Sequence, residues 1–315
     1  MPDISIERLN DFGTRIFVGA GVPQPIAQRV MQNLVRADVY GIHSHGVVRL
    51  ADYVRAVKRG KVVADAQPTI IKESPVIAVF DGHWGFGQVA AERAMQVAIE
   101  KAQANGVGIA VVRNSNHVGA IGEYTEMAAN AGLIGFAIVN GIGKLVAAHG
   151  GRARSLSTNP IAFSVPVPGG RPLLMDFATS VVAEGKIKVA RNKGVKIPPG
   201  WILDKEGAPS DEPQDLYDGG FLLPVGGLGS GHKGYGLSIM AEILGGLLSG
   251  TGAALLDSAP ANGCFFLALS PDCFRPSDEF LADVRRMVDI LRDTPPLDGV
   301  DAVLVPGDPE AKAEA

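Results

Sequence analysis

Apolar residues spaced three and four apart predict helices in the first sixty residues, because this spacing places them on one helical face. The stripes run through Leu9, Phe12, Ile16 and Phe17, and through Ile26, Val30 and Leu34. A third helix is predicted from Gly46 to about Arg59, where Gly60 ends it. The start of the chain is therefore expected to be helical.

From residue 76 the pattern changes to short apolar runs that alternate with helical segments. It predicts strands at residues 76–80, 107–112 and 133–139, with helices at 88–104 and 122–130 between them. This βαβαβ order then breaks. Residues 161–165 and 173–177 are strand-like and flank Pro168-Gly169-Gly170, which predicts an antiparallel hairpin. The sheet is therefore expected to be mixed.

The rest of the chain predicts helices around a long Pro/Gly-rich loop that extends through Pro224. The expected elements are helices at about 181–192, 235–249 and 277–292, strands at 264–269 and 302–305, and a frayed tail at 307–315.

Composition narrows the class of protein. The 315 residues are 46% hydrophobic and 20% charged, which suits a globular protein with a sizeable core. A net charge of −4 without a Lys/Arg run argues against nucleic acid or an anionic membrane as a partner. The start of the chain does not resemble a secretory signal, and the apolar stretch 234–256 contains Glu242, so we expect a buried helix there and no membrane partner. Cys264 and Cys273 lack CxxC spacing, which fits a reducing cytoplasm.

The most informative stretch is Ser44-His45-Gly46-Val47-Val48-Arg49. On the predicted helix His45, Arg49 and Tyr53 form one stripe. A histidine moves protons near neutral pH, and an arginine holds a carboxylate through paired hydrogen bonds. Oxidation of a 2-hydroxy acid, or reduction of a 2-oxo acid, needs both. The alternative is a histidine that only caps or packs locally. A metal site shared with His43 lacks further ligands.

A second polar cluster, Asn114-Ser115-Asn116-His117, follows a predicted strand and precedes a helix. Such strand ends often carry sites, so His117 is a second candidate for proton transfer, with a helix-capping loop as the alternative. Nearby, residues 85–90 fit the dinucleotide fingerprint G-x-G-x-x-A. The next strand offers no carboxylate for a ribose, which favours a glycine turn that lets the helix pack closely on the sheet.

Two further regions are suited to anions. Ser157-Thr158-Asn159 and the stretch from Asp176 to Ser180 border the predicted hairpin, and Thr179 and Ser180 precede the helix expected at 181, to which Lys186 and Lys188 add charge. The glycine loop 226–234 ends in His232 and Lys233, an arrangement that suits pyrophosphate. The alternatives are ordinary N-capping by Ser180 and a flexible linker.

Taken together, the chain resembles the malate/L-lactate dehydrogenase family of NAD(P)-dependent oxidoreductases, which is unrelated to the Rossmann lactate dehydrogenases. The matching motifs occur in family order and are Ser44-His45-Gly46, Asp81-Gly82 with Gly85-Phe86-Gly87-Gln88, Ser115-Asn116-His117, Thr158-Asn159-Pro160, Asp176 to Ser180 with Gly185-Lys186, and Gly231-His232-Lys233-Gly234-Tyr235-Gly236. His149-Gly150-Gly151-Arg152 resembles the hydroxycarboxylate dehydrogenase branch. One departure is Gly141, where many members carry Ser or Thr.

The resemblance implies an α/β (α+β) fold whose cofactor domain is a mixed, largely antiparallel sheet of the sulfolactate dehydrogenase-like type, closed by a helical domain, and not a Rossmann fold. We assign residues 1–72 plus 275–315 to the helical, substrate-side domain and 73–274 to the NAD(P)-binding domain. A homodimer and NAD or NADP as cofactor are implied. The implied roles are catalytic for His45 and His117, substrate-binding for Ser44, Arg49 and Tyr53, and cofactor-binding for Ser157, Thr158, Asn159, Asp176, Ala178, Thr179, Ser180, Lys186, His232, Lys233 and Gly307.

The expected reaction is hydride transfer between the nicotinamide and C2 of a small 2-hydroxy or 2-oxo acid. Arg49 holds the carboxylate, His45 takes or returns the hydroxyl proton, and His117 or Ser44 orients the oxygen. Relatives act as acid/base through the counterpart of either histidine. The alternatives are NADPH-dependent reduction of a cyclic imine, such as piperideine-2-carboxylate, a non-catalytic cofactor-binding protein, and a Rossmann binder that uses residues 85–90.

Overall fold

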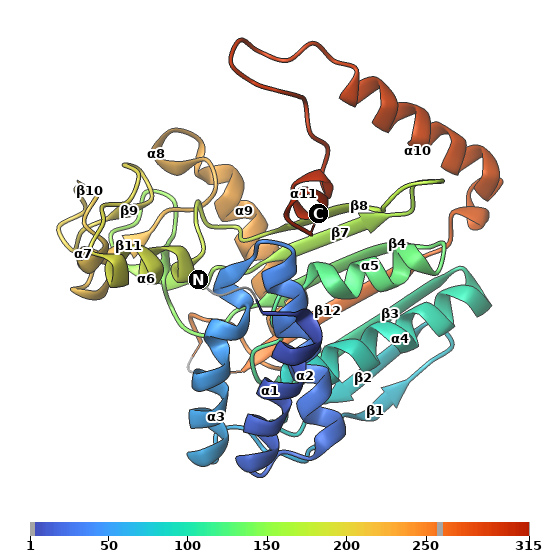
Figure 1. The fold of residues 1–315 in the computed structure, drawn as a ribbon, viewed down its shortest axis with the longest axis horizontal. Coiled ribbons are helices and arrows are strands. Elements are labelled where there is room, and N and C mark those ends of the chain that lie inside the picture. The colour runs from blue at the N-terminus through green and yellow to red at the C-terminus, as the bar shows by residue number, and fades with distance from the viewer. Residues whose placement is uncertain (1–3, 257–260, 315) are drawn as a thin grey trace.

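A seven-stranded sheet forms the centre of the computed structural model, which describes residues 4–256 and 261–314 (Figure 1). The strand order is β1-β2-β3-β12-β4-β7-β8. β2 pairs with β3 in parallel, and every other neighbouring pair is antiparallel. The strands are β1 (Thr69–Glu73), β2 (Ile77–Asp81), β3 (Val107–Ser115), β4 (Ile134–Asn140), β7 (Ile161–Val165), β8 (Leu173–Phe177) and β12 (Asn262–Leu269). The prediction of a mixed, largely antiparallel sheet without Rossmann topology is confirmed.

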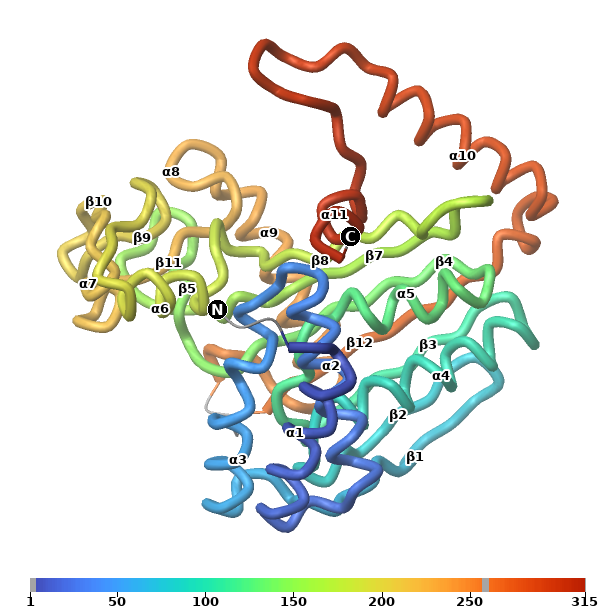
Figure 2. Tube along the Cα trace, viewed as in Figure 1, coloured from blue at the N-terminus to red at the C-terminus, as the bar shows by residue number. Residues whose placement is uncertain are grey.

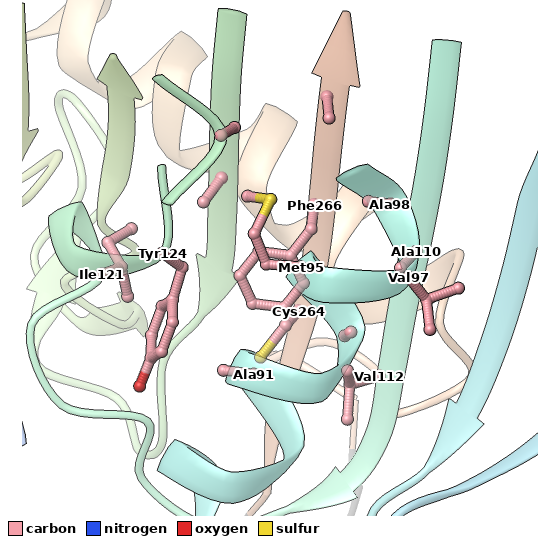
Figure 3. Packing of buried hydrophobic residues seen from close by; sticks show 14 of the residues in the cluster. Ala91, Met95, Val97, Ala98, Ala110, Val112, Ile121, Tyr124, Cys264 and Phe266 are labelled. Carbon is pink, nitrogen blue, oxygen red and sulfur yellow. The ribbon is translucent and has the colours of Figure 1, made fainter. Parts of the chain in front are cut away.

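Helices cover both faces of this sheet. On one face lie α4 (Gly87–Asn105) and α5 (Gly122–Asn130), and on the other α9 (His232–Ala241) and η3, a π-helix (Glu242–Leu247). Beneath α4 and α5, Val112 joins a core with Met95 and Phe266 (Figure 3), whereas its neighbour Val111 packs on the α9 side with Ala241. Because both faces are buried, the central strands are continuous apolar runs. The single helix predicted at 235–249 is therefore α9, which starts earlier, followed by η3.

The N-terminal helices lie in front of the end of α4 in the view of Figure 1 and share a core with Phe86. They are α1 (Ile6–Gly19), α2 (Gln24–Val39), the 3-10 turns η1 (His43–His45) and η2 (Val47–Arg49), and α3 (Leu50–Lys58). The prediction of one continuous helix from Gly46 is wrong. Gly46 is extended (φ −82°, ψ −157°), and a Cβ there would lie 2.0 Å from Asp38 Oδ1. That carboxylate also accepts from the backbone N–H of Val47, which fixes the break between η1 and η2.

A second sheet occupies the region that was predicted to be mostly loop, at the left of Figure 2. Its strands, in the order β10-β9-β11-β5-β6, are β5 (Val146–Ala147), β6 (Arg154–Leu156), β9 (Ile202–Leu203), β10 (Pro209–Ser210) and β11 (Phe221–Leu222), and they are joined by α6 (Glu184–Lys193), α7 (Pro213–Tyr217) and α8 (Gly227–Ser230). Strands of two or three residues are too short to show an alternating pattern, which is why the sequence did not indicate them. The helix predicted from residue 181 begins at Glu184.

The C-terminal part differs from prediction after α10 (Ser277–Arg292), which follows η4 (Pro271–Cys273). The strand predicted at 302–305 is absent, and residues 308–314 of the predicted frayed tail form α11 (Asp308–Glu314). Two contacts tie this end down: Leu174 of β8 donates its N–H to the Pro306 carbonyl (3.2 Å), and Arg292 pairs with Asp308 (2.6 Å). The two-domain division stays a prediction. Within the described ranges, no helix is long and apolar enough to cross a membrane.

Candidate functional site

Two histidines from distant parts of the chain meet beside the sheet. His45 lies on η1, and His117 lies in the loop between β3 and α5. Their rings stack with centroids 5.4 Å apart and an interplanar angle of 20°. Both side chains are half-buried. The structure thus brings together the two candidates for proton transfer.

Arg49 lies close to the same histidines, although not for the predicted reason. His45 and Arg49 belong to separate 3-10 turns, so the argument from one helical stripe is wrong. Arg49 Nε instead donates to the Ser44 carbonyl (2.7 Å), which folds the guanidinium back toward η1. A Cβ at Gly185 of α6 would lie 3.5 Å from Arg49 Nη2. Nη1 lies 3.9 Å from Asp52 Oδ2, within range of an ion pair but too far for a hydrogen bond. Neither Nη1 nor Nη2 makes a hydrogen bond within the described residues, so both can donate to a carboxylate.

Tyr53 and Ser44 contact the two imidazoles directly. The buried Tyr53 hydroxyl on α3 lies 2.6 Å from His117 Nδ1, and Gln88 Nε2 donates to the same hydroxyl (3.1 Å). Ser44 Oγ lies 3.0 Å from His45 Nδ1. Each ring therefore has its Nδ1 engaged by a hydroxyl.

Burial sets the protonation of this cluster. It lowers the pKa of His45 to about 4, helped by the charge of Arg49. Burial, with His45 and Arg49 as further causes, lowers the pKa of His117 well below the ordinary 6.5. Burial raises the pKa of Tyr53 to about 12. All three groups are neutral at pH 7, and Arg49 supplies the positive charge beside them.

The glycine-rich run before α4 packs against the His117 loop. A Cβ at Gly87 would lie 2.3 Å from the Asn116 carbonyl oxygen and 2.5 Å from that of His117. This close approach fits the glycine-turn interpretation, with the start of α4 packed on the loop that follows β3. The prediction did not include Gln88 as a site residue; the signal was a polar side chain in the first turn, on a helix face whose other buried residues are Gly, Ala, Val and Met.

Asn159 joins the turn after β4 to α9 and η3 through side-chain hydrogen bonds. It is fully buried: its Oδ1 accepts the N–H of Gly141 (2.9 Å), and its Nδ2 donates to Glu242 Oε1 (2.8 Å) and to Ser238 Oγ (3.0 Å). Ser157 lies against the same turn, because a Cβ at Gly141 would be 2.3 Å from Ser157 Oγ. A side chain at position 141 would therefore require Ser157 to move.

The stretch from Asp176 to Ser180 leads from β8 toward α6, with Ala178 half-buried within it. The Thr179 N–H donates to the Thr158 carbonyl (2.9 Å), and Ser180 Oγ donates to the Val182 carbonyl (2.8 Å). The prediction that Thr179 and Ser180 directly precede a helix is wrong, because α6 begins only after an extended Ala183.

Asp176 itself is engaged at the start of α5. Its Oδ2 accepts the N–H of Gly122 (2.7 Å). Burial is the main cause that raises its pKa to about 6. Gly307 lies by the same strand, with a φ of +101°, and a Cβ there would be 3.0 Å from the Pro172 carbonyl oxygen.

Three of the predicted basic residues, Lys186, His232 and Lys233, are exposed on two helices, whereas Lys188 is half-buried and lies 3.7 Å from Asp52. Lys186 lies in the first turn of α6, next to Gly185, where a Cβ would be 2.6 Å from Ser44 Cβ. α6 therefore starts beside the histidine cluster. His232 and Lys233 begin α9, and the His232 ring lies 5.8 Å from that of His149.

The His-x-His spacing does not gather ligands. His43 Nδ1 lies 3.0 Å from Asp38 Oδ1, whereas His45 contacts Ser44. In the part of the chain that the structure describes, no group of three or more His, Cys, Asp or Glu side chains could hold a metal ion.

The fold and the site together point to a class of dehydrogenases: the sheet is mixed and not of the Rossmann type, and two imidazoles and an arginine lie beside it. Comparison with known proteins supports this class. The model of the malate/L-lactate dehydrogenase family matches residues 4–315. Malate dehydrogenase of Pyrococcus abyssi is 43% identical over 296 residues, 91% of this chain and 81% of that protein. The crystal structure of malate dehydrogenase from Entamoeba histolytica superposes with a TM-score of 0.94 at 32% identity, covering 99% of this chain and 91% of that one. Sulfolactate dehydrogenase from Methanocaldococcus jannaschii gives a TM-score of 0.88 at 34% identity, covering 99% and 90%.

The chain therefore belongs to the malate/L-lactate dehydrogenase family. It is an oxidoreductase that acts on the CH–OH group of 2-hydroxy acids. The sheet topology argues against a Rossmann fold. Membership of this family argues against a non-catalytic protein.

Proposed function

We propose that the protein interconverts a small 2-hydroxy acid of the malate, lactate or hydroxycarboxylate type and its 2-oxo acid, with NAD or NADP. The observation that carries the proposal is the stacked pair of His45 and His117, 5.4 Å apart, beside Arg49. When bound, the nicotinamide donates or accepts the hydride that is exchanged at C2.

Each side chain of the cluster has a task that its contacts allow. The two terminal nitrogens of Arg49 bind the substrate carboxylate as a fork. His45, neutral at pH 7, takes the hydroxyl proton during oxidation and returns it during reduction. His117 or Ser44 orients the substrate oxygen. Proton transfer of this kind contributes about 10²–10⁴-fold to the rate.

The residues of α6 and α9 fit a dinucleotide. No side chain caps the start of α6, so the N–H groups of Glu184 and Gly185 have no hydrogen-bond partner among the described residues. α6 starts beside Ser44, and Lys186 lies in the same first turn, where its N–H donates to the Ala183 carbonyl (3.0 Å). Unpaired N–H groups and a nearby cation are the donor set that pyrophosphate prefers. His232 and Lys233 add exposed donors at the start of α9. Thr158 and Thr179 contribute through backbone: the Thr179 N–H donates to the Thr158 carbonyl, and the Thr179 carbonyl accepts from Val225, whose own carbonyl accepts from Gly234 of α9. Gly307 lies at the other end of β8, beside Pro172 and Leu174.

The test is a substrate panel with a site variant. Oxaloacetate, pyruvate and sulfopyruvate are assayed with NADH and with NADPH, beside piperideine-2-carboxylate for the imine alternative. His45→Ala should lower kcat by at least about 10²-fold while NAD(P)H binding, followed by fluorescence, persists. His83→Ala serves as the control, because His83 contacts Thr69 rather than the site. Unchanged turnover in His45→Ala would end this assignment.

We also propose a cytoplasmic homodimer. The side chains of Ile243 and Leu247 on η3, and of Leu248 directly after it, are apolar and exposed, as expected of a surface covered by a second copy. Cys264 and Cys273 are both free thiols, which suits a reducing compartment. Light scattering should give twice the chain mass, and Leu248→Glu should lower it; a monomeric wild type would contradict the dimer.

A further inference from the structure

His117 Nδ1 lies within hydrogen-bond distance of two groups. The Tyr53 hydroxyl is 2.6 Å away, and the backbone N–H of Gly119 donates to Nδ1 at 3.3 Å. A backbone N–H is only a donor, so Nδ1 must be the acceptor. An imidazole nitrogen that accepts carries no proton, and the neutral ring then holds its proton on Nε2.

Gln88 sets the direction of the bond between Tyr53 and His117. Its side chain is fully buried, and its Nε2 donates to the Tyr53 hydroxyl oxygen at 3.1 Å. With that oxygen already accepting, the hydroxyl hydrogen is available to Nδ1. The opposite amide orientation would place Oε1 against the hydroxyl, draw its hydrogen away and require a proton on Nδ1. A proton on Nδ1 would then face the backbone N–H of Gly119, so two donors would point at each other.

The backbone holds this network in place. Gln88 is in the first turn of α4, and its neighbour Gly87 brings that turn against the His117 carbonyl, as the 2.5 Å position of a built Cβ shows. Tyr53 comes from α3 and is buried. Three separate segments therefore converge on one imidazole nitrogen. Gln88 Oε1 has no hydrogen-bond partner within residues 4–256 and 261–314, so the amide reaches toward Tyr53 alone.

We propose that Gln88, acting through Tyr53, fixes His117 as the Nε2–H tautomer, so that His117 donates a hydrogen bond to the substrate C2 oxygen and is not the base. This inference rests on the proposed function. Gln88 and Tyr53 are positioning residues. During oxidation the substrate O–H bond breaks and its proton goes to His45 Nε2. The C2–H bonding pair leaves as hydride to the oxidised nicotinamide, and the C=O bond forms while His117 keeps its proton.

The surroundings of His117 agree with a neutral donor. The titratable or charged groups that face it are His45 from η1, Arg49 from η2 and Tyr53 from α3. His45 and Tyr53 are neutral at pH 7, and Arg49 is positive. No carboxylate is among them to favour a charged imidazole, and burial lowers the pKa of His117 further. A neutral histidine that polarises a carbonyl is an established catalytic arrangement.

The first test reads the tautomer directly. ¹⁵N-labelled histidine is observed by NMR at pH 7 in the full-length protein, with His117 assigned by its loss in His117→Asn. The expected result is a protonated Nε2 and an unprotonated Nδ1. In Gln88→Glu the carboxylate accepts the Tyr53 O–H, so the proton should move to Nδ1. A wild-type His117 protonated on Nδ1, or an unchanged tautomer in Gln88→Glu, overturns the inference.

The second test separates positioning from folding. Gln88→Met keeps the length of the side chain but loses the amide, and the exposed Gln28→Met is the matched control. For the 2-oxo acid that the wild type reduces, Gln88→Met should lower kcat about 10–100-fold, as for outer partners of ligating histidines. KM and the Kd of NADH should stay within about twofold, since substrate contacts are retained. A loss confined to KM, or equal losses in both variants, contradicts a positioning role.

The proposed function and the tautomer assignment fail separately. An Nε2–H signal without turnover of any 2-oxo acid contradicts the proposed function and leaves the tautomer assignment intact. Turnover together with an Nδ1–H signal overturns the tautomer assignment, and with it the positioning role of Gln88, but leaves the proposed function intact.

Discussion

Replacing Gly87 by alanine tests whether the close packing of α4 on the His117 loop holds His117 in position. A methyl group there would lie 2.3 Å from the Asn116 carbonyl oxygen and 2.5 Å from that of His117. Both neighbours are backbone, so no flexible side chain can move aside. The Asn116–His117 backbone and the start of α4 must therefore separate, which moves His117 relative to His45 and Tyr53.

The size of the effect follows from this geometry. Ordinary contact distances require the segments to part by about 1 Å, and a misplacement of about 1 Å can lower a rate by about 10²-fold. Overpacking costs about 1–3 kcal/mol of unfolding free energy. The helix gains back about 0.5–1 kcal/mol when alanine replaces glycine. We expect kcat to fall about 10²-fold and the unfolding free energy to fall by about 1–2 kcal/mol.

The assay compares Gly87→Ala with Gly19→Ala by steady-state kinetics, urea unfolding and NADH fluorescence titration. Gly19 ends α1, and a Cβ there meets nothing within 4 Å, so that variant should keep its activity and stability. NADH binding should survive in both variants, because we assign residues 85–90 to packing and place the dinucleotide at α6 and α9. Loss of NADH binding in Gly87→Ala with an intact fold would refute this reasoning.

Two further predictions come from the pKa shifts. Because the pKa of His45 is lowered to about 4, kcat/KM for oxidation should stay level from pH 7 to 5 and fall only as His45 is protonated near pH 4; an acid limb near 6.5 contradicts its burial beside Arg49. Because the folded pKa of Asp176 is raised from 3.8 to about 6, the folded state binds more protons over this range. Stability should therefore fall as pH rises from 4 to 6, by up to about 3 kcal/mol. In Asp176→Asn the unfolding free energy, measured with urea, should lack this fall between pH 4 and 6. If the free energies of the variant and the wild type changed in parallel with pH, Asp176 would not be the cause.

Local signals in the sequence found some elements with their bounds. The β7–β8 hairpin, α5 and α10 lie where turn residues and apolar spacing placed them. Non-local pairing was not accessible in this way. β12 lies between β3 and β4, although more than 100 residues separate it from both in the chain, so the βαβαβ order concealed an inserted antiparallel strand. β1 was missed because all five of its residues are exposed.

The sequence predicted which residues meet at the candidate site, but it did not predict the local backbone structure that brings them together. Arg49 reaches η1 by bonding the Ser44 carbonyl, whereas the prediction relied on a helical turn that Gly46 interrupts. No local pattern could show that His45 and His117 stack, because 72 residues separate them and only the tertiary fold joins them. The role of Gln88 was hidden within a glycine motif that indicated packing.

Transfer of a labelled hydride would test the proposed reaction itself. The protein is given NADH or NADPH that carries deuterium at both C4 positions of the nicotinamide, with the 2-oxo acid that it reduces fastest, and the product is analysed by mass spectrometry and NMR. We expect a single deuterium at C2 of the 2-hydroxy acid, formed at least about 10²-fold more slowly by His45→Ala. Product without deuterium at C2, or formed equally fast by His45→Ala, would contradict hydride transfer at C2 assisted by His45.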